Sequence, residues 1–144
     1  MSVSQVSLRS LNPDGAGSAF PAATVRVHIW IESHGKAVIG LGRATLLRRI
    51  QQTGSLKRAA EGLNMSYRAA WGKIRQSEAI LGQALIAPRG GRRAGHELTP
   101  FGLALLRAFD EWFLSVETYS NMKSQQCFPF ETAPFEGEEA ALAT

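Results

Sequence analysis

Two arginines, Arg68 and Arg75, lie seven positions apart in a segment whose apolar residues recur with helical spacing. At about 100° per residue, this spacing puts both guanidinium groups on the side of the helix opposite its apolar stripe. A guanidinium can contact phosphate or pair bidentately with the edge of a guanine. The pattern favours nucleic-acid recognition, with two solvated surface arginines as the alternative.

Four more polar or aromatic residues near these arginines are candidate DNA contacts. Ser55 and Ser66 precede apolar helical patterns, as N-cap residues do, and a phosphate contact of the Ser66 hydroxyl is what the family resemblance given below implies. The Tyr67 hydroxyl is equally suited to phosphate contact and to packing. Trp71 lies closer to the apolar stripe, so core packing is favoured over contact with DNA.

The elements that must position these side chains are two short helices within residues 54–81. The first has one apolar face, and its adjacent alanines permit a close helix crossing. The second begins at Ser66, has its own inward stripe, and ends at Gly82. The inward residues are Leu56, Ala59, Ala60 and Leu63 in the first helix, and Ala70, Ile74, Ser77 and Leu81 in the second.

A loop rich in glycine and arginine follows the second helix. Short strands at residues 84–87 and 97–98 flank the loop at residues 89–96, which makes a wing. Arg89, Arg92 and Arg93 are candidate contacts to the DNA backbone, and a solvated loop is the alternative.

Alternating apolar residues at 25–32, a turn, and a second apolar run at 37–39 predict a β-hairpin before the first helix, which spans about 43–52. A last helix is predicted from Pro100 to Tyr119. It has more apolar residues than one core contact requires, so a second copy of the chain is expected to cover part of it. The expected dimerisation residues are Phe101, Leu105, Phe109, Trp112, Phe113 and Val116.

The predicted organisation is a flexible leader at 1–23, a domain at 24–119, and an acidic, mostly disordered tail at 120–144. Residues 26–107 contain 14 Lys and Arg against four acidic residues, whereas residues 108–144 contain one Lys and seven acidic residues. A basic domain attracts polyanions such as DNA.

Composition also excludes several classes of function. A single cysteine permits no intrachain disulfide and fits a reducing cytoplasm, and no apolar stretch reaches the length of a membrane span. The three histidines are scattered, so we expect no metal site and no cofactor. Phosphate-binding and nucleophile motifs are absent, and we therefore expect no enzyme.

Residues 42–112 resemble the N-terminal DNA-binding domain of molybdate-dependent transcriptional regulators, the ModE family, and more distantly the helix-turn-helix of LysR-type regulators. The run Ser66-Tyr67-Arg68-Ala69-Ala70-Trp71 favours the molybdate group. The other matching residues are Gly42-Arg43, Leu46-Leu47, Ile50, Thr53-Gly54-Ser55, Ala59-Ala60, the Gly-rich wing and Leu98-Thr99-Pro100-Phe101-Gly102.

The resemblance implies a mainly α fold with small β: a winged helix-turn-helix preceded by a β-hairpin and followed by a long dimerisation helix. It implies a homodimeric, sequence-specific regulator that binds double-stranded DNA, with genes for molybdate transport or molybdoenzymes as its expected targets. The family binds its oxyanion in a C-terminal pair of β-barrel modules. The residues after Trp112 are too few to form them, so no direct molybdate binding is expected here. The alternative is a winged-helix protein-interaction module.

Overall fold

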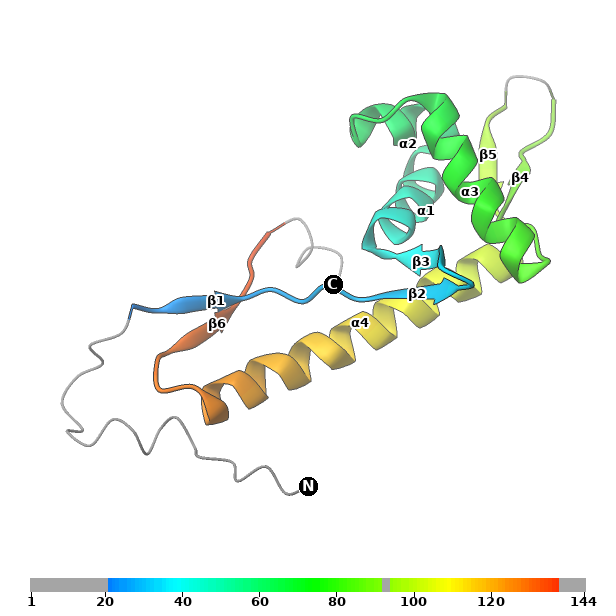
Figure 1. Ribbon diagram of the computed structural model, residues 1–144. Helices are drawn as coiled ribbons and strands as arrows, with labels where there is room; N and C mark the ends of the chain where they lie inside the picture. The colour runs from blue at the N-terminus through cyan, green and yellow to red at the C-terminus, as the bar shows by residue number, and fades with distance from the viewer. Residues whose placement is uncertain (1–20, 92–93, 138–144) are drawn as a thin grey trace. The chain divides into compact units, whose positions relative to one another are not determined.

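The computed structural model describes residues 21–91 and 94–137, which form two compact units. One unit is His28–Trp112, and the other combines the described residues 21–27 and 113–137. Helix α4 (Pro100–Cys127) runs through both units (Figure 1). Each unit is described separately below.

The unit His28–Trp112 begins with an antiparallel hairpin of β2 (Trp30–Ser33) and β3 (Lys36–Gly40). Both residues of its turn, His34 and Gly35, have positive φ angles, a conformation that glycine adopts without strain. The sequence predicts this hairpin, but with a first strand that covers residues 25–32. The structure instead has a separate short strand, β1 (Ala23–Val25), and no strand at residues 26–29.

Three helices follow the hairpin: α1 (Leu41–Thr53), α2 (Leu56–Gly62) and α3 (Tyr67–Leu81). Their apolar faces meet in one core, as helical periodicity predicts. The buried residues include Ile39, Leu46, Leu47, Ile50, Leu56, Ala59, Ala60, Ala70, Ile74, Leu85, Leu106 and Phe109.

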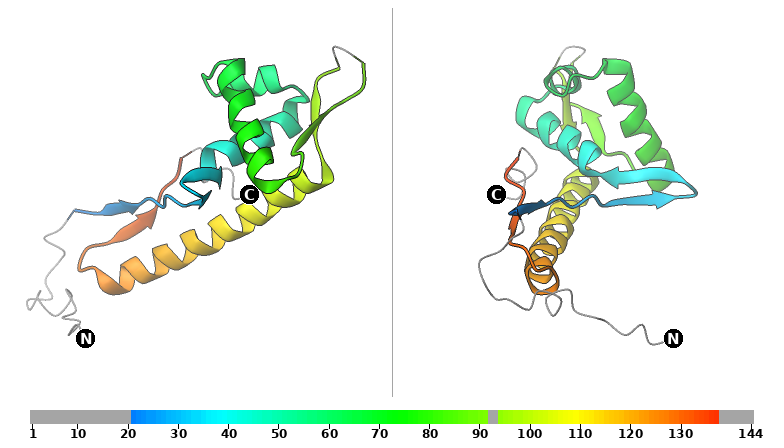
Figure 2. Two further views of the ribbon diagram at one scale, coloured as in Figure 1. Left: turned by 45° about the vertical axis from the view of Figure 1, so that its right-hand side comes forward. Right: turned by 60° about the vertical axis from the view of Figure 1, so that its left-hand side comes forward.

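A second antiparallel hairpin, β4 (Ile86–Pro88) with β5 (His96–Leu98), forms the wing. Figure 2 shows this hairpin beside α3 in two further views. Thr99 caps α4, because its Oγ1 accepts the Gly102 N–H at 3.0 Å. The same hydroxyl donates to the Ala84 carbonyl at 2.6 Å, which joins the start of α4 to the segment before β4.

In the other unit, β1 pairs in parallel with β6 (Thr132–Pro134). The Ser124 and Thr132 hydroxyls lie 2.7 Å apart and connect α4 to β6. These elements differ from the prediction. Helix α4 continues past its expected end at Tyr119, and residues 120–137, expected to be mostly disordered, contain helix and strand. Most of the expected leader, residues 1–20, lies outside the described residues.

The fold class is confirmed. The described chain is mainly helical with two-stranded sheets, and it has a winged helix-turn-helix between a β-hairpin and a long helix.

Candidate nucleic-acid interface

Helix α3 presents two chemically different faces. Ala70, Ile74 and Ser77 are buried, as predicted, and the Ser77 Oγ donates to the Val38 carbonyl of β3 at 2.6 Å. The opposite face carries Arg68 and Arg75, and both are exposed, together with Gly72 between them. The core therefore fixes the rotation of α3 and leaves its arginine-bearing face open to solvent.

Serine caps and a tight turn fix how α2 and α3 meet. The Ser55 Oγ accepts the Arg58 N–H at 3.2 Å, and the Ser66 Oγ accepts the Ala69 N–H at 3.0 Å. Asn64 takes a left-handed conformation with a positive φ angle, which allows the chain to reverse direction within a few residues. Both predicted caps are present, and each hydroxyl keeps a hydrogen to donate.

The two arginines of α3 have different surroundings. The Arg75 guanidinium lies 4.2 Å from the centre of the Trp71 ring, and its Nη1 lies 3.7 Å from the Glu78 Oε2. Within residues 21–91 and 94–137, the Arg68 side chain has no hydrogen-bond or ion-pair partner. Arg68 is thus available for a ligand, whereas Arg75 would have to leave or share its contacts.

Trp71 joins α3 to the wing. Its half-buried ring lies 5.9 Å from the His96 ring of β5 and 6.3 Å from the exposed Tyr67 ring, centre to centre. The Tyr67 and Trp71 planes are nearly parallel, at 10°. Core packing was predicted for Trp71, and the structure shows that its packing includes the base of the wing. The sequence around His96 shows neither helical periodicity nor strand alternation, so no sequence pattern identifies His96 as a contact of Trp71.

The base of the wing is tied to the turn between α1 and α2. The His96 N–H donates to the Gly54 carbonyl at 3.0 Å, and the Arg89 N–H donates to the Gly95 carbonyl at 3.1 Å. The Arg89 guanidinium lies where a side chain at Gly54 would project, so Arg89 is at the wing base. Arg92 and Arg93 lie outside the described residues.

Two arginines of α1 position the neighbouring helices, and sequence reasoning gave them no role. The Arg43 Nε donates to the Lys73 carbonyl at 3.3 Å and its Nη2 to the Gln76 Oε1 at 2.5 Å, and burial lowers the pKa of Arg43. Arg48 forms a bidentate ion pair with Asp110 of α4. Their partners lie 30 or more positions away, so no local pattern could reveal them.

Positive charge dominates the exposed surface of residues 54–98. In the described part of this stretch, two acidic residues, Glu61 and Glu97, are exposed, while Glu78 is buried beside Arg75. The exposed basic residues are Lys57, Arg58, Arg68, Lys73, Arg75 and Arg89. Such a surface attracts phosphates.

The expected dimerisation residues fall into two groups. Phe101 and Trp112 are 37% and 36% exposed, and Leu105 and Val116 are half-buried. Phe109 and Phe113 are 3% and 4% exposed within a single chain, so their assignment to a surface free for a second copy is wrong. Helical periodicity shows that α4 has more apolar residues than one contact needs. It does not show which of them pack in the chain's own core and which remain exposed for a partner.

The described residues contain no group of three or more His, Cys, Asp or Glu arranged to hold a metal ion. None of the helices within the described ranges combines the length and apolar character that crossing a membrane requires.

The sequence is similar to one protein-family model and to two named bacterial proteins. Residues 41–103 match the family model described as bacterial regulatory helix-turn-helix protein, lysR family. The chain is 36% identical over 75 residues to the molybdenum-pterin-binding protein MopB of Rhodobacter capsulatus, covering 51% of this chain and 28% of the relative. It is 36% identical over 72 residues to the transcriptional regulator ModE of Yersinia pestis, covering 47% and 27%. The chain thus spans just over a quarter of the length of these relatives.

Solved structures with a similar arrangement include a CbnR_DBD-DNA complex, which has 24% identity, a TM-score of 0.46, and coverage of 58% of this chain and 92% of that chain. Full-length BenM has 16% identity and a TM-score of 0.46, with coverage of 71% and 43%. ArgP from Mycobacterium tuberculosis has 20% identity and a TM-score of 0.44, with coverage of 69% and 45%.

Residues 41–103, which match the lysR-family helix-turn-helix model, fold in this structure as a helix-turn-helix with serine caps on α2 and α3, followed by a wing.

Proposed function

We propose that this chain is a sequence-specific DNA-binding transcriptional regulator, in which α3 reads base edges in the major groove. The observation that carries the proposal is the state of Arg68. It lies in the first turn of α3 and is exposed, and its side chain has no hydrogen-bond or ion-pair partner among the described residues. The N-terminal residues of a recognition helix are those that reach base edges in helix-turn-helix complexes.

The surrounding structure supports this use of α3. Core contacts and the Ser66 cap hold α3 in place. The exposed face of α3 can therefore enter a DNA groove without a change in the position of the helix. The wing base is attached to α3 through Trp71, which places the wing backbone next to the same face. We assign the phosphate contacts to the wing and to the serine hydroxyls, and base contact to Arg68.

A binding-site selection from random duplex DNA, followed by affinity measurements on Arg68→Ala, tests the proposal. A bidentate contact to guanine is worth about 1–3 kcal/mol, so the variant should lose roughly 5- to 150-fold of its preference for selected over scrambled duplex. Arg107→Ala removes another exposed arginine, on α4, and serves as the matched control. Equal losses on selected and scrambled duplex would refute the assigned role of Arg68.

We further propose that the chain acts as a homodimer through α4. Phe101, Leu105, Ala108 and Trp112 recur at spacings of four, three and four, so they share one face of the helix. Three of them line an apolar hollow of about 300 Å³ beside the β2–β3 hairpin. A two-fold dimer would bury this face and present two α3 helices to half-sites about one DNA turn (~34 Å) or a multiple apart.

The names of two sequence relatives support a proposal about the target genes. MopB and ModE have names that refer to molybdenum-pterin binding and to transcriptional regulation. We propose that this chain controls genes for molybdate transport or for molybdoenzymes. Selected binding sites that occur upstream of such genes would support this setting, and their absence there would count against it.

A further inference from the structure

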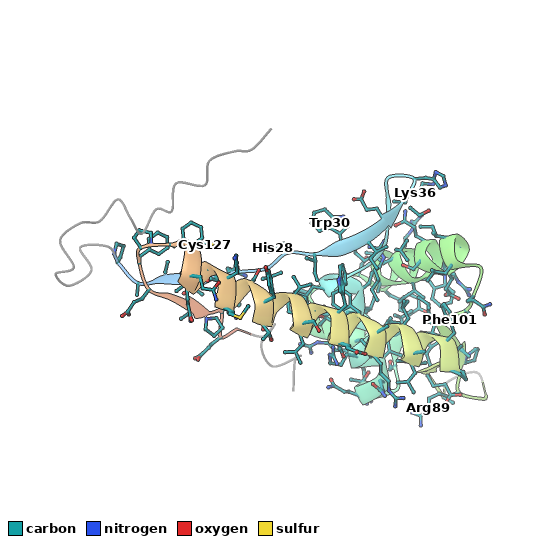
Figure 3. The ribbon with its side chains drawn as sticks, turned by 90° about the horizontal axis from the view of Figure 1, so that it is seen from below. His28, Trp30, Lys36, Arg89, Phe101 and Cys127 are labelled. Carbon is teal, nitrogen blue, oxygen red and sulfur yellow. The ribbon has the colours of Figure 1, made fainter. Side chains whose placement is uncertain are left out.

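A hollow of about 500 Å³ lies in the unit that combines residues 21–27 and 113–137, whereas the helix-turn-helix belongs to the other unit. Its walls come from three segments: strand β1, the last part of α4, and the chain that leads from α4 to β6. In Figure 3 Cys127, one of the lining residues, lies at the end of α4 beside β1 and β6. We call this space the α4 hollow. Its volume falls in the range of small-molecule sites, about 300–1,000 Å³.

Hydrogen bonds hold the walls of the α4 hollow in place. The Ser124 and Thr132 hydroxyls lie 2.7 Å apart, and the Gln125 Nε2 donates to the Thr132 carbonyl at 3.3 Å, so β6 is attached to α4. Strand β1 is attached to β6 through parallel pairing, and the Ala23 N–H donates to the Glu131 carbonyl at 2.9 Å. The α4 hollow is therefore preformed, which lowers the entropic cost of binding.

Most of the lining is apolar, and part of it is aromatic. The Phe128 and Phe130 rings stack with their centres 5.2 Å apart and their planes 19° apart. Val25 of β1 also lines the α4 hollow. Phe128 is 39% exposed, so a ligand could still cover much of its ring. Aromatic side chains of this kind supply a large area of apolar contact to a planar ligand.

One cation lies in these apolar surroundings. Lys123 lines the α4 hollow, is exposed, and has a side chain with no hydrogen-bond or ion-pair partner in the part of the chain that the structure describes. None of the described carboxylates lines the α4 hollow. Arg26, the other basic residue described in this unit, has its guanidinium 4.0 Å from the centre of the Phe135 ring. An ammonium group beside apolar walls favours a ligand that has one negative charge on an apolar body.

We propose that the α4 hollow binds a small organic acid with an apolar, aromatic body. The Lys123 ammonium group pairs with the carboxylate, and the side chains of Val25, Phe128 and Phe130 cover the body of the ligand. The proposed DNA contacts involve none of these residues. This inference therefore goes beyond the proposed function and gives the chain a ligand site outside the helix-turn-helix.

Titration of the full chain with 1-naphthoate, followed by two-dimensional NMR of the backbone amides, locates the site. The affinity usual for small ligands puts the Kd at about 1 mM or below for a probe of about 13 non-hydrogen atoms. The largest shifts should fall in β1, in the last part of α4 and in the segment between α4 and β6. The neutral analogue 1-naphthamide should shift the same residues but bind more weakly. Largest shifts in any other part of the chain, or equal binding of acid and amide, would overturn the proposal.

Lys123→Gln tests the charge contribution. Exposed ion pairs are weak, so the Kd for 1-naphthoate should rise about 2- to 5-fold, while the Kd for 1-naphthamide should stay unchanged. The variant should thereby lose the preference for acid over amide. Lys36→Gln removes an exposed lysine from the other unit and is the matched control, which should keep this preference. A preference that survives Lys123→Gln would show that the ammonium group does not hold the carboxylate.

Cys127→Phe tests the space. The added ring would occupy the α4 hollow, so the Kd for both probes should rise roughly 10-fold or more. Gln126→Phe adds the same ring at a neighbouring exposed position that does not line the α4 hollow, and it should bind both probes as the wild type does. All of these variants are at exposed positions, and circular dichroism should show the wild-type helix content. Equal affinities of Cys127→Phe and Gln126→Phe would place the probes elsewhere and overturn the proposal. None of these measurements involves DNA, so their failure would leave the proposed function standing.

Discussion

The ion pair between Arg48 and Asp110 connects α1 to α4 inside the unit His28–Trp112. The Arg48 Nη1 lies 2.9 Å from the Asp110 Oδ2, and the Nη2 lies 2.5 Å from the Oδ1. The two side chains are 18% and 28% exposed. We expect this pair to stabilise the first part of α4 against the helix-turn-helix, because bidentate pairing fixes direction as well as distance.

Its magnitude follows from this intermediate burial. Exposed ion pairs contribute about 0.2–1 kcal/mol, whereas removing one partner of a fully buried pair costs about 3–5 kcal/mol. With both groups partly reached by solvent, Asp110→Ala should lower the free energy of unfolding by about 1–3 kcal/mol. The Arg48 Nε is buried without a hydrogen-bond partner among the described residues, so Arg48 depends on Asp110 for compensation of its charge.

A double-mutant cycle measures the pair directly. Urea unfolding of the wild type, Arg48→Met, Asp110→Ala and the double variant should give a coupling energy of about 1–2 kcal/mol. Protein concentration must be held constant, since a dimer couples stability to concentration. Arg107→Ala, an exposed position on the same helix, should change stability by no more than about 0.5 kcal/mol. Single-variant effects that add to within about 0.3 kcal/mol would refute the coupling.

Two further predictions concern dimerisation and packing. Trp112→Lys places a charge on the exposed apolar face of α4 and should therefore weaken dimerisation. If Trp112 is a central contact, the Kd of the dimer should rise roughly 30-fold or more, as measured by light scattering after gel filtration. A molecular mass that equals that of the wild type at every concentration would contradict the proposed interface. Gly102→Ala should destabilise the fold by about 1–3 kcal/mol, because its Cβ would meet the Leu85 carbonyl. Gly72→Ala is the control, because a Cβ at this position meets open space, and alanine should stabilise α3 by roughly 0.5–1 kcal/mol relative to glycine. Similar urea midpoints for the two alanine variants would contradict the packing argument.

Much of the helix-turn-helix could be predicted because its signals are local. The Ser55 and Ser66 caps each bond an N–H three residues ahead, and the left-handed ends at Gly54 and Gly82 use the conformational freedom of glycine. Helical periodicity also separates the buried face of α3 from the face with Arg68. For these features, the residues that interact are neighbours along the chain.

The candidate site was only partly predictable. Periodicity gives the exposure of Arg68 and Arg75, but not that the Arg75 guanidinium lies over Trp71 and beside Glu78. In the α4 hollow, Lys123 carries no signal of its own, because an exposed lysine on a helix is ordinary. Its apolar surroundings exist only after β1 pairs with β6.

The sequence alone determined that residues 54–81 form two helices, where α2 and α3 begin, and which side of α3 carries positive charge. Tertiary structure decided which apolar residues of α4 are buried, that Arg48 pairs with Asp110 across 62 positions, and that Ala23–Val25 pairs with Thr132–Pro134. Local preferences follow from backbone sterics and side-chain spacing within a few residues. A contact between distant segments depends instead on whether the whole chain can bring its two partners together and bury them.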